Sequence, residues 1–299
     1  MIELSKLQHF LAVWDHKHFG RAALALGVSQ QAVSASIARL EDQLEVMLFQ
    51  RLGHGVVPTD FAIALEPHAR LSVSEVRSAE AEISALRLGG HRIIRLGVGQ
   101  SFASRCIPQA IALFRRLQPN YSLVCTVGPT TQLYQSLVRG DLELVVSAPP
   151  NELVPPLEIA REFLMRERDA VLVRAEHPLA KTPDCGLDVL RNYTWLAAVT
   201  TVGGGWQRIC HTFSALGYEP PHRVVRTDSV ALGDSFLLVD DFIAVMSYEA
   251  HFDQISSGQL VEIHAPELIH FRPAYVARDG RIRPSSGVTS LIRAIRESI

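Results

Sequence analysis

The sequence predicts an α/β protein in three parts: an all-helical head with a helix-turn-helix, one long helix, and a two-lobed α/β region. Residues 21–51 hold two short amphipathic segments on either side of Gly27, which is the pattern of a helix-turn-helix. Residues 59–88 keep a single helical periodicity. From residue 92 onward, strand and helix patterns alternate, as in a parallel sheet covered by helices on both faces.

Length and composition are those of a soluble globular protein with two or three compact units. The chain has 299 residues, of which 47% are hydrophobic and 20% are charged. Its first 14 residues form an amphipathic helical pattern and lack the order of a signal peptide. The richest apolar run, 235–246, is interrupted by Asp240 and Asp241 and is too short to span a bilayer. We therefore expect a cytoplasmic protein without a membrane partner.

The four cysteines, Cys106, Cys125, Cys185 and Cys210, are scattered without a Cys-x-x-Cys pair. This spacing predicts neither a zinc site nor a small disulfide framework. We expect reduced, mostly buried thiols, no metal and no cofactor. A redox switch between Cys185 and Cys210 stays open as an alternative.

The helix-turn-helix follows a first helix over residues 3–15. Gly27 can take the left-handed conformation that a tight turn needs, and the Ser29 hydroxyl can cap free backbone amides. The second helix of the motif is therefore predicted to begin at Gln30.

The outward face at the start of that second helix carries Gln30, Gln31 and Ser34. A helix fits the DNA major groove, where Gln can make a paired hydrogen bond to adenine and Ser can bind a base or a phosphate. An ordinary helical hairpin with polar residues in solvent remains the alternative. The net charge is -2 overall, and residues 1–58 hold five basic and five acidic residues. Attraction to phosphate must therefore come from the local placement of single basic residues and from the free backbone amides at the amino ends of helices.

Residues 51–59, RLGHGVVPT, resemble the wing of a winged helix. Gly53 and Gly55 permit a sharp hairpin. Arg51 and His54 would then approach phosphate or the minor groove, although Arg51 could equally pair with a nearby acid.

Thr59 can cap the long helix, and Pro67 is expected to bend it without ending it. Apolar and small residues recur at steps of four and three, which is a heptad seam that favours pairing with a second copy. Packing of this helix against its own chain is the alternative. Residues 88–91, Leu-Gly-Gly-His, are predicted to form a hinge. The seam consists of Leu65, Ala69, Ser72, Val76, Ala79, Ile83 and Leu86.

The remaining chain predicts two α/β lobes, with the last strand and helix returning to the first lobe. Such an arrangement is a hinge-type binding fold with a cleft between the lobes. Expected strands are 93–99, 122–128, 142–148, 194–199, 222–227, 242–247 and 274–278, and expected helices are 104–117, 131–139, 206–216, 230–239 and 290–299.

Ligand contacts should lie in loops after the strands, because open α/β sheets bind at the carboxyl ends of their strands. The polar candidates there are hydroxyls and amides at helix starts, which favour a small anion such as a carboxylate. Each of them alone could be a plain helix cap. The candidates are Gln100, Ser101, Phe102, Thr130, Thr131, Thr200, Thr201, Val202, Gly203 and Thr227.

Motifs of enzymes are weak or missing. Gly97 and Gly99 match only part of a dinucleotide fingerprint, since Phe102 stands in place of the third glycine. We expect no catalytic residues. A solute-binding protein with a helical oligomerisation arm is the rival, but it would need export.

The segment AxxLGVSQQAVSASIARLEDQLEVMLFQR, followed by VVPT, a long helix and two α/β lobes, resembles the LysR-type transcriptional regulators over essentially the whole chain. The resemblance implies a winged helix-turn-helix at 1–58 and a dimerising linker with its hinge at 59–89. It further implies an effector domain at 90–299 that is similar to periplasmic binding proteins, with lobe 1 at about 91–162 and 267–299 and lobe 2 at about 163–266. Such proteins assemble as dimers or tetramers, bind and bend promoter DNA, and respond to a small effector, here expected to be an organic acid.

By position, the resemblance implies DNA contacts for Gln30, Gln31, Ser34 and Arg51. It implies effector contacts for Ser101, Thr130, the loop from Thr200 to Gly203, and Thr227. The chain departs from the family at four places. Gln31 stands where proline is common, Gly20 replaces a Thr or Ser that contacts phosphate, and Glu45 and Ala62 each replace a glycine.

Overall fold

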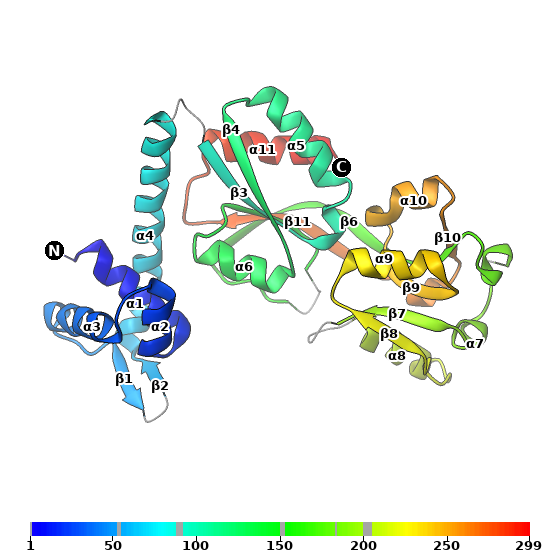
Figure 1. Ribbon diagram of the computed structural model, residues 1–299, viewed down its shortest axis with the longest axis horizontal. Helices are drawn as coiled ribbons and strands as arrows, with labels where there is room; N and C mark the ends of the chain where they lie inside the picture. Colours follow the sequence, from blue (N-terminus) through cyan, green and yellow to red (C-terminus); the bar gives the residue numbers. More distant parts are fainter. Residues whose placement is uncertain (1, 53–54, 88–91, 150–152, 183, 200–204) are drawn as a thin grey trace.

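A computed structural model describes residues 2–52, 55–87, 92–149, 153–182, 184–199 and 205–299. Figure 1 shows a helical head, one long helix that leaves it, and two α/β lobes joined by extended strands. The predicted order of parts along the chain is therefore confirmed.

The head is a three-helix core with a two-stranded wing. Phe10, Val33, Ile37 and Leu40 are fully or almost fully buried at its centre. Phe49, the first residue of the wing, packs its ring 5.4 Å from that of Phe10 and so joins the wing to the core. The elements are α1 (Leu4–His16), α2 (Phe19–Leu26), α3 (Gln30–Leu44), β1 (Phe49–Leu52) and β2 (Gly55–Pro58).

The turn between α2 and α3 has the predicted chemistry. Gly27 takes a φ of 67°, and the Ser29 hydroxyl accepts a hydrogen bond from the Ala32 amide at 3.2 Å. Helix α3 accordingly begins at Gln30, as predicted. Glu45, which ends α3, takes a left-handed φ of 56° without being glycine.

The long helix α4 (Asp60–Arg87) runs through Pro67 as one continuous element. Its start is capped as predicted, since the Thr59 hydroxyl accepts a hydrogen bond from the Ala62 amide at 3.3 Å. The buried Arg70 guanidinium bonds to Asp15 on α1 and to Glu66 on α4. These charge-assisted bonds fix the first half of α4 to the head.

The heptad seam on α4 divides into two parts, which corrects the prediction of one uniform seam. Leu65 packs against the core of its own head and Ala69 is fully buried there, because α1 covers this part of the helix. Further along, the residues of the seam are exposed; the side chain of Leu86 lies outside the described residues. The exposed ones are Ser72, Val76, Ala79 and Ile83.

The two lobes share a nine-stranded sheet in the order β4-β3-β5-β11-β6-β9-β7-β8, with β10 paired to β6. Strands β3, β4 and β5 are parallel, as are β7, β8 and β9. The predicted parallel sheets are nevertheless mixed, because the chain leaves the first lobe along β6 and returns along β11, so these two strands are antiparallel. The strands are β3 (Arg92–Val98), β4 (Tyr121–Val127), β5 (Leu144–Ser147), β6 (Ile159–Arg174), β7 (Thr194–Ala198), β8 (Val224–Thr227), β9 (Phe242–Ser247), β10 (Leu260–Ile263) and β11 (Phe271–Asp279).

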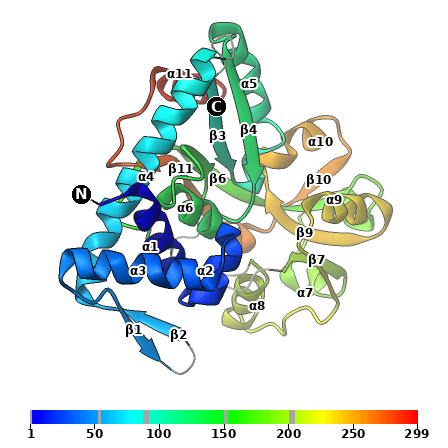
Figure 2. The same cartoon turned by 60° about the vertical axis from the view of Figure 1, so that its left-hand side comes forward.

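Helices cover both faces of this sheet (Figures 1 and 2). In lobe 1 the C-terminal helix packs beside α5 over Leu96 and Val146, so the return of the chain to the first lobe is confirmed. In lobe 2 the buried Trp195 packs its ring 5.9 Å from that of Phe213 on α8. The helices are α5 (Cys106–Leu117), α6 (Thr130–Val138), α7 (Leu187–Leu190), α8 (Gly205–Ala215), α9 (Val230–Val239), α10 (Phe252–Ser256) and α11 (Ser286–Glu297), with short 3-10 turns η1 (Gln100–Phe102), η2 (Pro178–Lys181), η3 (Glu249–His251) and η4 (Pro266–Leu268).

Candidate DNA-binding surface and effector site

The start of α3 presents its polar side chains outward. Gln30 and Gln31 are exposed and Ser34 is half-buried, whereas Val33 of the same helix is fully buried. The amino end of a helix also carries unpaired backbone amides that favour a phosphate. This surface can therefore read base edges and hold a phosphate at once.

The wing is tied to α3 by two contacts. The Arg51 guanidinium donates a hydrogen bond to the Ser34 hydroxyl at 2.8 Å and lies 4.8 Å from the centre of the Phe19 ring. The Glu41 carboxylate accepts the backbone amides of Leu48 and Phe49 at 2.7 and 3.1 Å. The predicted Arg51 thus lies beside α3, whereas His54 lies outside the described residues.

A histidine that the sequence analysis did not select caps α2. The His18 Nδ1 accepts hydrogen bonds from the amides of Gly20 and Arg21 at 3.0 and 3.4 Å. A nitrogen that accepts carries no proton, so the proton of the neutral ring lies on Nε2. A Cβ at Gly20 would lie 3.3 Å from the Gln30 Oε1, so this glycine leaves room for the Gln30 side chain.

The predicted effector residues of lobe 1 lie where its strands end. Gln100 is exposed and Ser101 is half-buried in η1, directly after β3. Thr130 is half-buried and Thr131 is exposed at the start of α6, after β4. Phe102 differs, because it is 2% exposed and packs in the core of lobe 1. We therefore assign the Phe102 ring to packing and no longer to effector contact.

On lobe 2, Thr227 ends β8, and its hydroxyl accepts the Ser229 amide at 3.0 Å. This bond shapes the turn before α9. Four further predicted residues, Thr200, Thr201, Val202 and Gly203, lie outside the described residues.

Two buried hydroxyls on lobe 1 were missed. Ser147 ends β5 and Tyr134 lies one turn into α6; both are almost fully buried. The two hydroxyls lie near each other and near Arg161, yet within the described residues neither makes a hydrogen bond of normal geometry. Burial raises the pKa of Tyr134, against the opposing effects of Ser147 and Arg161. The Arg161 guanidinium also lies 4.6 Å from the centre of the Tyr275 ring.

Ser147 could have been found by the same reasoning as the predicted residues, because it is the polar residue that directly follows the apolar run of β5. Its register partner is Tyr275 on β11, whose partner on β6 is Phe163. A hydroxyl and two rings thus form one row across three strands. Such a row can contact a ligand that carries both a polar group and a flat apolar body.

Charged residues join the crossing strands to lobe 2. Asp169 on β6 pairs with Arg272 on β11 at 2.9 Å and with Arg208 on α8 at 3.5 Å. Burial raises the pKa of Asp169, against the opposing effect of the two guanidinium groups. The fully buried Glu167 lies 3.5 Å from Arg272. These pairs hold the start of α8 against the strands between the lobes.

The two lobes also meet beyond the crossing strands. The Ser104 hydroxyl of lobe 1 donates to the Ala250 carbonyl of lobe 2 at 2.9 Å. Arg105 pairs with Glu249 at 3.9 Å and lies 4.0 Å from the centre of the Phe252 ring. These contacts set the relative position of the lobes.

The thiols differ from the prediction that most are buried. Cys125 is exposed, and Cys106, Cys185 and Cys210 are half-buried. Burial raises the pKa of all four, that of Cys106 to about 11, so none is held as a reactive thiolate. Within the described ranges, no group of three or more His, Cys, Asp or Glu side chains is arranged to hold a metal ion.

Across the same described ranges, no helix combines the length and the apolar character that crossing a bilayer requires. The longest helix, α4, carries many charged residues along its 28 residues.

Both the DNA-binding part and the effector-binding part of the chain match known protein families. The family model described as bacterial regulatory helix-turn-helix protein, lysR family, matches residues 4–62, and the LysR substrate binding domain matches residues 88–299. The regulator PcaQ of Agrobacterium fabrum is 28% identical over 303 residues, covering 99% of this chain and 95% of that protein. The regulator GalR of Pseudomonas putida is 27% identical over 262 residues, covering 87% of this chain but only 65% of that protein.

A solved structure has the same fold. Full-length LysG of Corynebacterium glutamicum, with bound effector Arg, matches with a TM-score of 0.63 at 17% identity, covering 99% of this chain and 98% of that one. The two family models together span nearly all of the chain. The chain therefore belongs to the LysR family of transcriptional regulators, which bind DNA through the helix-turn-helix and an effector through the second domain.

Proposed function

We propose that this regulator binds a pseudo-palindromic promoter site through Gln30, Gln31, Ser34, Arg51 and His54. The observation that carries the proposal is the exposed start of α3 with Arg51 bonded to Ser34, because it joins base-reading amides to a cation that can reach the backbone. The charge-neutral head favours binding by more than one copy, since a single copy attracts phosphate weakly.

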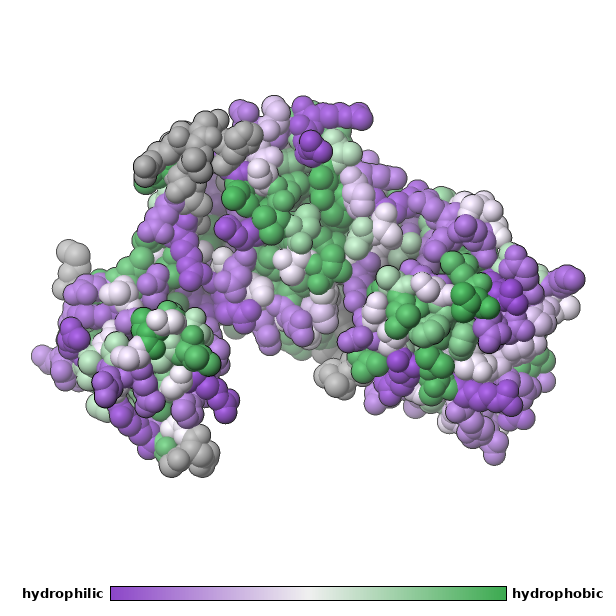
Figure 3. Space-filling view, viewed as in Figure 1, coloured by the Kyte–Doolittle hydropathy of each residue, from purple (hydrophilic) through white to green (hydrophobic). Residues whose placement is uncertain are grey.

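We further propose self-association into a dimer or tetramer through α4. Apolar side chains stay exposed on this helix in the single chain, including Phe61, Ile63, Val76 and Ile83. Of these, Val76 and Ile83 are seven residues apart and share one face of the helix, which is typical of a surface that a second helix covers. Apolar surface also gathers over α9 on lobe 2 (Figure 3), where Leu232, Leu238 and Val239 are exposed.

For the effector, we propose a small organic molecule with a carboxylate, bound between the lobes. Gln100, Ser101, Thr130, Thr131 and Thr227 lie at strand ends, where amides and hydroxyls favour an anion. The buried hydroxyls of Ser147 and Tyr134 extend this set. We also retain Thr200, Thr201, Val202 and Gly203 from their position in the sequence. The effector bound to LysG, Arg, is an amino acid and carries a carboxylate.

Two experiments test these proposals. DNase I footprinting on the DNA upstream of the gene should reveal two protected half-sites, and the absence of saturable, salt-sensitive binding would count against the DNA proposal. A thermal-shift screen of the full chain against small carboxylic acids should then find a stabilising acid, whereas its amide should give no shift. Equal shifts with acid and amide would contradict the carboxylate proposal.

A further inference from the structure

The carboxyl end of α6 touches the linker helix α4. The turn after α6 contains Gly140, whose φ of 76° suits glycine. A Cβ at Gly140 would lie 3.0 Å from the Ser74 hydroxyl oxygen of α4. The glycine therefore allows a close approach between the effector domain and the linker helix.

An ion pair lies beside this approach. Arg77 of α4 lies 3.7 Å from the Asp141 carboxylate, nitrogen to oxygen. Asp141 is itself held on the α6 side, because its carboxylate accepts a hydrogen bond from Arg139 at 2.9 Å and its amide donates to the Ser136 carbonyl at 2.9 Å. A linker residue thus pairs with a carboxylate that moves with α6.

Helix α6 can carry a displacement from one end to the other. Leu133, Tyr134 and Leu137 are buried against the sheet. The backbone hydrogen bonds of the helix keep its two ends in a fixed relation, so a displacement of one end would also displace the other. Its nine residues span about 13 Å. The proposed effector residues Thr130 and Thr131 lie at its amino end, and the contact with α4 lies at its carboxyl end (Figures 1 and 2).

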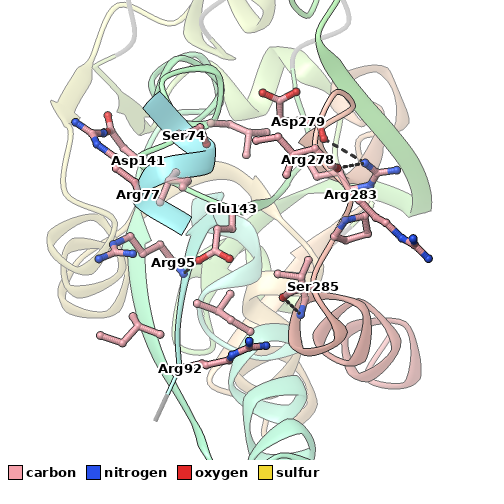
Figure 4. Close-up of a pocket in the computed structure, with 18 of the residues that line it drawn as sticks. Ser74, Arg77, Arg92, Arg95, Asp141, Glu143, Arg278, Asp279, Arg283 and Ser285 are labelled. Carbon is pink, nitrogen blue, oxygen red and sulfur yellow. Dashed lines mark hydrogen bonds and ion pairs between the residues drawn. The ribbon is translucent and has the colours of Figure 1, made fainter. Parts of the chain in front are cut away.

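A cavity of about 870 Å³ lies next to the contact, between α4 and lobe 1. Figure 4 shows Arg77 and Asp141 on one side of it and Arg278 and Arg283 on the other. Because this interface is hollow, α4 can tilt about the contact at Ser74 without opening an apolar core. A few polar contacts therefore have a large influence on the angle of the linker.

We infer that Arg77 and Asp141 are positioning residues that set the angle of the linker helix against lobe 1, and with it the placement of the recognition helices on DNA. A shift of α6 on effector binding would reach α4 through this pair. The inference rests on the proposed function for the effector link, but the pair itself can be tested without an effector.

The test measures the DNA bend angle, by circular permutation gel shift, for the full chain on its upstream promoter fragment. The variants are Arg77→Asp, Asp141→Arg and the double exchange, with the same charge change at the exposed Arg223 of lobe 2, Arg223→Asp, as the matched control. Each single reversal should change the bend angle by more than about 10°, against total bends of about 40–90° in bending regulators. The double exchange recovers the attraction between positions 77 and 141 but not the bond from Arg139, so it should move the angle back towards the wild-type value. Arg223→Asp should leave the angle unchanged.

Two further measurements separate this role from a structural one. Because Arg77 and Asp141 are about half exposed, the melting temperature should not change, and neither should affinity for an isolated half-site. A bend angle that is equal in wild type and both reversals, or that the double exchange does not move back towards the wild-type value, would overturn the inference. A wild-type protein that fails to bind the fragment would instead contradict the proposed function.

Discussion

Arg51 of the wing donates a hydrogen bond to the hydroxyl of Ser34 on the recognition helix, at 2.8 Å. The same guanidinium lies over the Phe19 ring of α2, so one side chain of the wing contacts both helices of the helix-turn-helix. In the free protein this arrangement holds a cation beside Ser34, on the helix whose amides are proposed to read bases. Preorganised contacts of this kind lose less conformational entropy on binding.

Replacing Arg51 with Ala should weaken binding about equally for all DNA sequences. If Arg51 contacts phosphate, a plot of the logarithm of the DNA association constant against the logarithm of the salt concentration should become less steep. The magnitude of its slope should decrease by about 1 for each subunit bound. Gel shifts at several salt concentrations measure this slope. Ser34→Ala is the matched variant, since it frees the guanidinium but keeps its charge, and it should leave the slope unchanged. A loss of sequence preference in Arg51→Ala would contradict the assignment to phosphate.

Replacing Gln31 with Ala should reduce discrimination between the specific site and a variant site by about 1 to 3 kcal/mol, if Gln31 pairs with a base. Gln43→Ala is the control, because it changes the same residue type near the other end of α3, where the Gln43 amide oxygen accepts a hydrogen bond from Lys6. Competition gel shifts measure the specificity ratio. An unchanged ratio for Gln31→Ala would remove Gln31 from the base-reading set.

Local backbone chemistry made the head predictable from the sequence. Gly27 and Ser29 act within a few residues of their own positions, so the turn and the start of α3 follow from residue type. The alternation of strands and helices was equally visible, because each pattern lies within one element.

Contacts between distant residues could not be predicted in this way. Strand β6 carries Glu167 and Asp169, which are charged, yet both are buried because Arg272, 103 residues after Asp169, lies beside them. Because charged residues interrupt this segment, its sequence pattern does not predict a buried β-strand. The ion pair between Arg77 and Asp141 likewise depends on how the linker helix packs against lobe 1.

Replacing Glu45 with Gly should stabilise the head by about 0.5 to 1 kcal/mol. The left-handed φ of 56° strains a residue with a Cβ, and this gain exceeds the entropy that glycine loses on folding. Urea unfolding of the variant measures the free energy. Glu45→Ala keeps the Cβ and should give no gain, so equal stabilisation by Ala and Gly would contradict the backbone explanation.

His251 should contribute pH-dependent stability to lobe 2. Burial lowers its pKa, but hydrogen bonds to Asp234 at 3.0 Å and to the Ser247 carbonyl at 2.8 Å outweigh burial, so the pKa is raised. A raised pKa gives stability that is complete below the unfolded value of about 6.5 and is lost as the pH rises through the folded value.

His251→Gln should therefore destabilise the protein more at about pH 5.5 than at about pH 9. Thermal unfolding of both proteins across this range measures the difference. His211→Gln, at an exposed histidine of α8, is the control. An equal loss of stability at both pH values would show that the charge of His251 does not matter.

The most direct test of the central claim is a DNase I footprint of the full chain on its upstream DNA, with and without an acid that raises its melting temperature. The account predicts two protected half-sites whose spacing or hypersensitive bands change when the acid is present, and no such change with the matching amide. A footprint that is absent, or one that the stabilising acid leaves unaltered, would contradict a regulator switched by a carboxylate bound between its lobes.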